Sequence, residues 1–173
     1  MAEPVAVTPS MTPAVGKTTG NTRVLAPLRG RAVPLQQVPD PTFAQGIVGN
    51  GAAIDPPQEV VDAVAPISGT VLQMMPHAYI IVSSDGVGVL VHLGLDTVQL
   101  GGEGFTALVQ KGDKVEAGDP VITYDVPAIL AAGRNPIVPV VVMDKKPEDI
   151  MLADVVAAGG QLTSSQELFT VKN

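Results

Sequence analysis

The sequence of 173 residues has no cysteine and no tryptophan, and it contains only three phenylalanines and two tyrosines. The absence of cysteine excludes disulfide bonds, thiolate metal sites and a cysteine nucleophile. With so few aromatic residues, the core must be built from Val, Ile, Leu, Ala and Met. The 18 glycines and 16 prolines interrupt the chain too often for long helices, so many short elements joined by turns are expected.

Basic residues are also scarce, since ten Lys and Arg face 17 Asp and Glu for a net charge of −7. The basic residues are scattered, which argues against binding to nucleic acid. No apolar run approaches the ~18 residues that a membrane span requires. The opening segment MAEPVAVTPSMTPAVGKTTG lacks the basic start and continuous apolar core of a signal peptide. We therefore expect an acidic, cytoplasmic protein that is not membrane-embedded.

The distribution of residue types predicts one domain with a leader. Residues 1–22 are rich in Pro, Thr, Ala and Gly without a period, which predicts a disordered leader before a single domain at 23–173. Within the domain, LAPLRGRAV (25–33) is echoed by VAPISGTVL (64–72), and residues 109–125 have a strand, turn, strand pattern. These features predict a mainly all-β fold: an antiparallel β-sandwich or partly open barrel with repeated hairpin motifs, internal pseudo-symmetry and a few short helices.

Two short helices are expected in the second half of the chain. One covers about 127–132, and the other about 147–158, with Asp144 as a candidate N-cap. Between them, residues 135–144 are too rich in valine for anything but a strand, and Pro139 is expected to place that strand at an edge or a bend.

Both histidines of the chain, His77 and His92, lie within one short stretch. Two β-branched runs there are separated by Asp85-Gly86, which is a strong hairpin signal. A two-residue loop would place Tyr79 opposite His92, with His77 on the same face as Tyr79. The two imidazoles would then be diagonal neighbours on one face of the sheet.

Three interpretations of this pair follow from the residues alone. The histidines can be incidental. They can bind a metal with Asp96 as a third ligand, although no typical ligand spacing supports this and no separate general base is evident. They can also act covalently, because an imidazole nitrogen carries a phosphoryl group and a second histidine can donate a hydrogen bond to its oxygens.

The segment VLVHLGLDTVQLGGEGF (89–105) resembles the active-site signature of the glucose-type enzyme IIA domain of the bacterial phosphoenolpyruvate-dependent sugar phosphotransferase system. The resemblance extends over residues 26–56 and 65–71 upstream, and over 111–125 and 139–144 downstream. It implies an antiparallel β-sandwich, which agrees with the fold predicted from the repeated segments. It also implies a phosphocarrier function, which agrees with the covalent interpretation of the histidine pair.

The resemblance also implies roles for individual residues. His92 matches the histidine that accepts a phosphoryl group from the phosphohistidine of HPr and passes it to the cysteine of an enzyme IIB domain. His77 matches the histidine that steadies the phosphoryl group, and Asp96 matches an acidic residue beside the site. The apolar positions at which the two partners dock are matched by Phe43, Ile47, Val48 and Val98. The family's chemistry needs no cofactor, so zinc bound at the histidines would be adventitious.

Without cysteine the chain has no IIB domain, and without a membrane span it has no permease, so we expect a separate IIA subunit, monomeric by default. It departs from enteric members at Met75, where they have a threonine two residues before the first histidine. Two alternatives stay open beside the phosphocarrier. One is a biotinyl or lipoyl carrier domain modified at Lys145 or Lys146, and the other is a zinc-binding protein.

Overall fold

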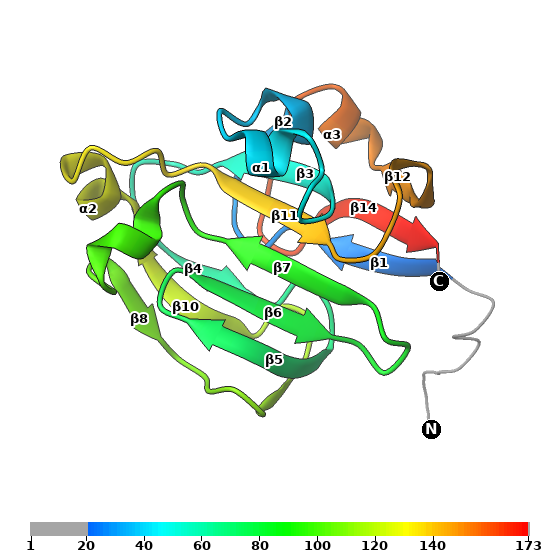
Figure 1. Ribbon diagram of the computed structural model, residues 1–173, viewed down its shortest axis with the longest axis horizontal. Coiled ribbons are helices and arrows are strands. Elements are labelled where there is room, and N and C mark those ends of the chain that lie inside the picture. Colours follow the sequence, from blue (N-terminus) through cyan, green and yellow to red (C-terminus); the bar gives the residue numbers. More distant parts are fainter. Residues whose placement is uncertain (1–20, 173) are drawn as a thin grey trace.

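The computed structural model describes residues 21–172, which form short strands with a few single-turn helices (Figure 1). The strands are β1 (Asn21–Leu25), β2 (Gly30–Pro34), β3 (Asn50–Asp55), β4 (Val60–Val64), β5 (Gly69–Met75), β6 (Ala78–Val82), β7 (Gly88–His92), β8 (Phe105–Ala107), β9 (Lys114–Val115), β10 (Pro120–Asp125), β11 (Val138–Val142), β12 (Ile150–Leu152), β13 (Gln161–Leu162) and β14 (Glu167–Lys172). The α-helices are α1 (Pro41–Ala44), α2 (Val126–Ala131) and α3 (Asp154–Ala157), and the 3-10 helices are η1 (Leu35–Gln37), η2 (Thr97–Leu100) and η3 (Pro147–Asp149). None of the helices in this part of the chain is long and apolar enough to cross a membrane.

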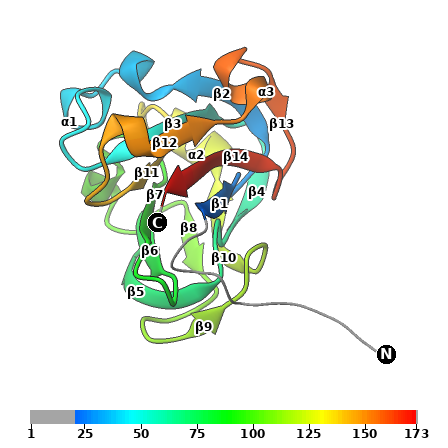
Figure 2. The same ribbon diagram turned by 90° about the vertical axis from the view of Figure 1, so that its right-hand side faces the viewer.

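The strands form three sheets whose pairings are antiparallel. The large sheet has the order β13-β2-β3-β11-β7-β6-β5-β9, and the two small sheets have the orders β1-β14-β12 and β4-β10-β8. Figures 1 and 2 show both small sheets on the same face of the large one. The main hydrophobic core joins all three sheets, because its buried residues come from strands of each. The predicted antiparallel β-sandwich is thereby confirmed.

A second, smaller hydrophobic cluster covers the opposite face of the large sheet. Strand β7 shows how side-chain alternation separates the two, since Val89 and Val91 face the main core while Leu90 faces the smaller cluster. The smaller cluster consists of Val33, Leu35, Val38, Phe43, Ala53, Ala78, Leu90, Leu95, Ile137 and Val141. We call it the outer cluster. It matters for function because His92, two residues after Leu90, ends β7 beside it.

The sequence echo corresponds to a pseudo-two-fold arrangement of the described strands. Strands β1, β2, β3, β11, β12, β13 and β14 occupy the same places in one half as β4, β5, β6, β7, β8, β9 and β10 in the other. The echoed segments cross and bond reciprocally: the Leu25 amide donates to the Pro66 carbonyl (2.9 Å), and the Val64 amide donates to the Pro27 carbonyl (2.7 Å). The predicted internal pseudo-symmetry is confirmed.

Two predictions of secondary structure need correction, and one is confirmed. Helix α2 agrees with the helix expected at 127–132. The helix expected at 147–158 is wrong, since strand β12 interrupts it: Ile150 pairs with Val171 of β14 and packs against the main core. Asp144 has a φ of 61°, which is not the extended conformation of an N-cap residue.

The edge or bend expected at Pro139 is also wrong, because β11 is a central, fully buried strand. Pro139 is tolerated there although it has no N–H to donate. It pairs with Ala53 of β3, and the pairing of β11 with β7 begins only at Val140, so no residue of β7 needs the missing N–H. At the beginning of the described chain, β1 includes Asn21 and Thr22, the last two residues of the predicted leader. The rest of that predicted leader, residues 1–20, lies outside the described residues.

Candidate active site

The hairpin that carries the two histidines has a different register from the one expected. Ala78 lies opposite His92, and Tyr79 lies opposite Val91. The expected pairing was wrong by one residue because the hairpin has a three-residue loop, closed by the Ser83 amide donating to the Val87 carbonyl (2.9 Å). As a result, Tyr79 faces the main core and does not share a face with His92.

His77 nevertheless meets His92, because it lies in the turn between β5 and β6 and not within a strand. Met75 pairs with Ala78, so that Pro76 and His77 form a two-residue turn. The Leu93 amide donates to the His77 carbonyl (2.8 Å) and fixes this turn against the end of β7. The centroids of the two imidazole rings are 5.1 Å apart, and the ring planes are inclined at 73°.

The orientation of the His92 ring is set by a backbone carbonyl. Its Nδ1 lies 2.6 Å from the carbonyl oxygen of Gly94. Because a carbonyl only accepts hydrogen bonds, Nδ1 must carry the proton, and Nε2 of the neutral ring keeps its lone pair. The His92 ring also contacts Phe43, with 5.1 Å between the ring centroids.

Gly94 occupies a place that only glycine fits. Its φ is +86°, and a Cβ atom added there would lie 2.6 Å from Cγ2 of Thr97. The buried Thr97 hydroxyl donates to the Leu93 carbonyl (2.8 Å), and the Gly94 amide donates to the Ile137 carbonyl (3.1 Å). The chain leaving β7 is therefore held on both sides, and the carbonyl that faces His92 has a fixed direction.

Burial lowers the pKa of both histidines, and the neighbouring groups add to this effect at His77 but oppose it at His92. Burial lowers the pKa of His77, and the neighbouring His92 lowers it further. Burial also lowers the pKa of His92, although the hydrogen bond to Gly94 and the carboxylates of Asp40 and Asp96 oppose this. Both rings are consequently neutral near pH 7, as a nucleophilic nitrogen requires. The two carboxylates would stabilise positive charge that develops on the His92 ring.

The remaining predicted site residues divide into exposed and buried ones. Ile47 and Val98 are large apolar residues with 70% and 62% of their surface exposed, while Val48 is partly buried against the outer cluster. Phe43 is only 5% exposed, so it mainly packs against His92 and offers little surface to a partner. Asp96 is exposed at the start of η2.

Within residues 21–172, no three His, Cys, Asp or Glu side chains are placed so that they could hold a metal ion. His77, His92 and Asp96 therefore do not form the ligand set that the metal interpretation required.

The sequence interpretation missed Asp40 and Gly94. Asp40 is the N-cap of α1, where its side chain accepts from the Thr42 amide (2.9 Å), and Pro41 follows at the first helical position. The Asp-Pro-Thr pattern is a signal for a helix start, but its closeness to His92 depends on long-range packing. Gly94 could be read as a turn residue, yet its hydrogen bond to His92 becomes visible only in three dimensions.

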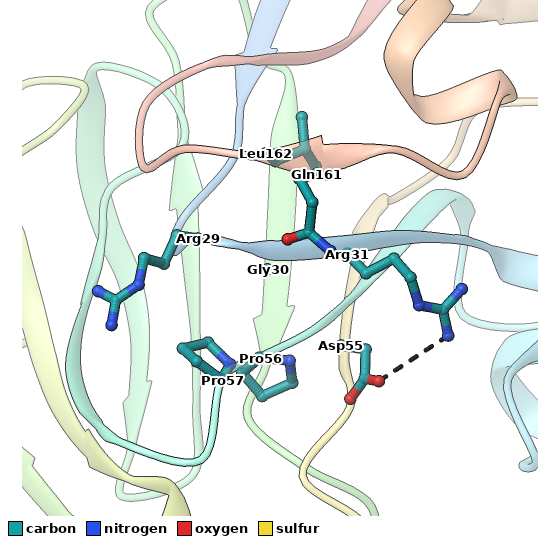
Figure 3. Close-up of a pocket in the computed structure, with 8 residues that line it drawn as sticks. All are labelled: Arg29, Gly30, Arg31, Asp55, Pro56, Pro57, Gln161 and Leu162. Atoms are coloured by element: carbon teal, nitrogen blue, oxygen red, sulfur yellow. Dashed lines mark ion pairs between the residues drawn. The ribbon is translucent and has the colours of Figure 1, made fainter.

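A pocket of about 300 Å³ elsewhere in the fold contains two arginines (Figure 3). It is lined by Arg29, Gly30, Arg31, Asp55, Pro56, Pro57, Gln161 and Leu162. The two guanidinium groups point away from each other, and each has an acidic partner, Glu59 for Arg29 and Asp55 for Arg31. The pseudo-two-fold equivalent is a pocket of about 330 Å³ lined by Ser68, Gly69, Thr70, Val82, Ser83, Ser84, Lys114 and Val115. The pocket is therefore a result of the strand arrangement itself, and its two arginines do not converge on a site for an anion.

Comparisons with known proteins show the family to which the chain belongs. Residues 22–147 match the family model for the phosphoenolpyruvate-dependent sugar phosphotransferase system, EIIA 1. The glucose-specific EIIA component of Halalkalibacterium halodurans is 45% identical over 121 residues, which are 69% of this chain and 69% of that protein. The corresponding component of Staphylococcus epidermidis is 40% identical over 140 residues, covering 79% of this chain and 83% of that protein.

A longer relative and a solved structure extend the comparison. The mannose-specific EIIBCA component of Corynebacterium glutamicum is 48% identical over 119 residues, or 69% of this chain, which spans only 17% of that protein. The glucose permease IIA of Mycoplasma capricolum superposes with a TM-score of 0.78 at 30% identity, covering 88% of this chain and 97% of that one. The chain therefore belongs to the EIIA 1 family of the phosphoenolpyruvate-dependent sugar phosphotransferase system, whose members are phosphotransferase components.

Proposed function

We propose that His92 carries a phosphoryl group on Nε2, which it accepts from the phosphohistidine of HPr and passes to the cysteine of an enzyme IIB domain. The observation that carries the proposal is the contact of 2.6 Å between His92 Nδ1 and the Gly94 carbonyl. It occupies one ring nitrogen and leaves the other as the nucleophile. The imidazole does the chemistry without a cofactor, and the reaction takes place in the cytoplasm.

The first transfer moves the phosphoryl group from a nitrogen of the donor imidazole to Nε2 of His92. The Nε2 lone pair of His92 forms a bond to phosphorus, while the nitrogen–phosphorus bond of the donor breaks and its electron pair returns to the donor imidazole. The His92 ring keeps its proton on Nδ1 and gains positive charge. The Gly94 carbonyl and the carboxylates of Asp40 and Asp96 favour that charge. In the second transfer the phosphoryl group leaves for a thiolate sulfur, and the ring returns to its neutral form.

His77 is proposed to donate a hydrogen bond to a phosphoryl oxygen. The centroid of its ring lies 5.1 Å from that of His92, so its N–H can reach an oxygen of a phosphoryl group carried by His92. Enzymatic phosphoryl transfer depends mainly on positioning and on stabilising charge at these oxygens. His77 is only 9% exposed, so few water molecules can compete for its hydrogen bond to the phosphoryl oxygen.

The exposed side chains of Ile47 and Val98 are proposed to contact both partners in turn. Apolar contact suits a chain with a net charge of −7 that gains further negative charge when phosphorylated. The Corynebacterium glutamicum relative is named as one chain with B, C and A components, which supports a IIB domain as the receiving partner.

The carrier alternative has less support from the fold. Lys145 and Lys146 follow β11 in a loop that leads to η3, so neither lies at a hairpin tip. The Lys145 amine also donates to the Lys172 carbonyl (2.7 Å).

The proposal is tested with enzyme I, HPr and radiolabelled phosphoenolpyruvate. The wild-type chain should gain one acid-labile phosphate, and His92→Ala should gain none. His77→Ala should accept phosphate but transfer it poorly to a IIB domain, and His77→Gln should recover part of that transfer because its amide still donates. Phosphorus-coupled nitrogen NMR should place the group on Nε2. Labelling of His92→Ala, or a phosphate on Nδ1, would contradict the proposal.

A further inference from the structure

Three consecutive backbone carbonyls, those of Asn135, Pro136 and Ile137, run beside the loop that follows His92. The Asn135 carbonyl accepts from the Leu95 amide (2.8 Å), and the Ile137 carbonyl accepts from the Gly94 amide (3.1 Å). The outer two carbonyls therefore hold Gly94 and its neighbour. The direction of the Gly94 carbonyl, and with it the orientation of His92, depends on where this three-residue segment lies.

The middle carbonyl is held by a side chain from another sheet. The hydroxyl of Tyr124, on β10, donates to the Pro136 carbonyl (2.8 Å). The Tyr124 ring is fully buried and stacks on Phe105, with ring centroids 5.6 Å apart and planes inclined by 6°. Because the ring is fixed by packing, its hydroxyl fixes the segment at its centre.

The same hydroxyl also lies against Gly94 itself. A Cβ atom placed on Gly94 would be 3.1 Å from the Tyr124 hydroxyl and 3.1 Å from the Asn135 carbonyl oxygen. Gly94 is thus enclosed by the two groups that determine its position. A water molecule in place of the hydroxyl would have to make the bond to Pro136 without the support of a packed ring.

We propose that Tyr124 is a positioning residue for phosphoryl transfer, acting through the Asn135–Ile137 segment and Gly94 on the tautomer and orientation of His92. The inference rests on the proposed function of His92. Tyr124 does not touch the phosphoryl group. Its contribution is to keep Nδ1 protonated and Nε2 directed toward the partner. Loss of the hydroxyl relaxes the segment, lets the Gly94 carbonyl turn, and admits the opposite tautomer, in which Nε2 carries the proton and is not nucleophilic.

The chain offers a matched control in its other tyrosine. Tyr79 is also fully buried, and its hydroxyl donates to a backbone carbonyl, that of Val64 (2.7 Å). Val64 is the last residue of β4 and pairs with Pro120, at the other end of β10 from Tyr124. Tyr79→Phe therefore removes the same kind of hydrogen bond without touching the support of Gly94.

The experiment compares Tyr124→Phe and Tyr79→Phe by two measurements. Long-range nitrogen–proton NMR of the imidazole rings reports the tautomer of His92, and rapid mixing with phospho-HPr reports the rate of acceptance. Tyr124→Phe should shift His92 toward the tautomer with Nε2 protonated and slow acceptance about tenfold. Tyr79→Phe should leave both unchanged at a similar loss of stability. If the two variants give the same His92 tautomer, the positioning role is wrong.

Two provisions keep the outcomes distinct. If the wild-type chain accepts no phosphate, the proposed function fails, while the tautomer comparison still decides whether Tyr124 orients His92. If Tyr124→Phe does not fold, Asn135→Ala replaces it, because the Asn135 side-chain oxygen accepts from the Ile137 amide (3.0 Å) and stabilises the same segment. Asn135→Ala should shift the His92 tautomer in the same direction, and an unchanged tautomer would overturn the inference.

Discussion

The imidazole rings of His77 and His92 lie at 73° to each other with 5.1 Å between their centroids, although the two residues belong to different secondary structure. His77 belongs to a two-residue turn, and His92 is the last residue of a strand. His92 has a ring nitrogen hydrogen-bonded to a carbonyl of the loop that follows it. The pair is therefore chemically unequal, with one ring held by its Nδ1 and the other beside it.

The conformation of Gly94 leads to a prediction about stability and activity. Gly94→Ala should lower the free energy of unfolding by about 2–4 kcal/mol, because the residue has a φ of +86° and its Cβ would contact Thr97 at 2.6 Å. It should also nearly abolish phosphorylation of His92. Gly101→Ala is the control, since its φ is +62° but a Cβ there meets nothing within 4 Å. The control should lose only about 1 kcal/mol and keep its phosphorylation. Urea unfolding and phosphate incorporation measure both effects, and equal losses for the two variants would contradict this account.

The lowered histidine pKa values predict how stability depends on pH. Both pKa values lie below the usual 6.5 in the folded protein, so the unfolded chain binds more protons once the pH falls below that value. The free energy of unfolding should therefore decrease as the pH falls from about 6.5 toward the folded pKa values. His92→Gln should flatten this decrease, and the double variant with His77→Gln should flatten it further. Urea unfolding between about pH 5 and pH 7.5 tests the sign. A wild-type stability that rises on acidification would contradict it.

The carboxylates beside His92 predict a change in its titration. Asp40→Asn and Asp96→Asn should each lower the pKa of His92 further, because each removes a negative charge that favours the protonated ring. Asn at position 40 still accepts from the Thr42 amide, so the cap of α1 is kept.

Each variant should also slow phosphate acceptance by up to about fivefold, as expected for a partly exposed charge interaction of about 0.2–1 kcal/mol. Asp113→Asn, in a turn where Asp113 accepts from the Gln110 amide, is the control and should leave the His92 titration unchanged. NMR titration of the ring protons gives the answer.

The exposed apolar residues predict a loss of partner binding without a loss of stability. Ile47→Ser and Val98→Ser should each weaken binding to HPr about tenfold, because a partner covers side chains that are now in water. Unfolding free energies should stay within about 0.5 kcal/mol of wild type. Met151→Ser is the control: Met151 is 41% exposed on β12, which lies near the C-terminus and away from the end of β7 (Figure 1). Calorimetric titration with HPr measures the affinities, and equal effects for all three variants would argue against a specific docking surface.

Local patterns in the sequence were sufficient for much of the fold. The repeated Ala-Pro segments indicated the pseudo-two-fold, and Asp85-Gly86 indicated the hairpin with both histidines. The predicted strand register of this hairpin was wrong because a two-residue and a three-residue loop can contain the same turn residues. Packing of Tyr79 into the main core selects the three-residue loop. Pro139 was misassigned for a related reason, since a missing N–H is harmful only where a neighbouring strand needs it.

The support of the site was beyond prediction because it depends on contacts between distant segments. Tyr124 and Pro136 are close in the chain, but their link to Gly94 requires β10, β11 and the end of β7 to be already in place. Asp40 influences His92 only because α1 packs Phe43 against the ring. Such relationships have no signature in residue spacing, whereas the resemblance to the family predicted the roles of the two histidines directly.

The pseudo-two-fold has a consequence for how the chain can be rearranged. The half that runs from β4 to β10 begins and ends at neighbouring positions, since Val60 pairs with Asp125. In the other half, Asn21 pairs with Lys172 in the same way. Each half therefore begins and ends at adjoining positions, and the half from β4 to β10 is inserted between β3 and β11 of the other half. A circular permutant that joins Lys172 to Asn21 by a short linker and opens between β3 and β4 should retain every strand pairing. The same adjacency means that a domain fused at either described end would be tethered at one spot, at the opposite end of β7 from the histidines (Figure 1).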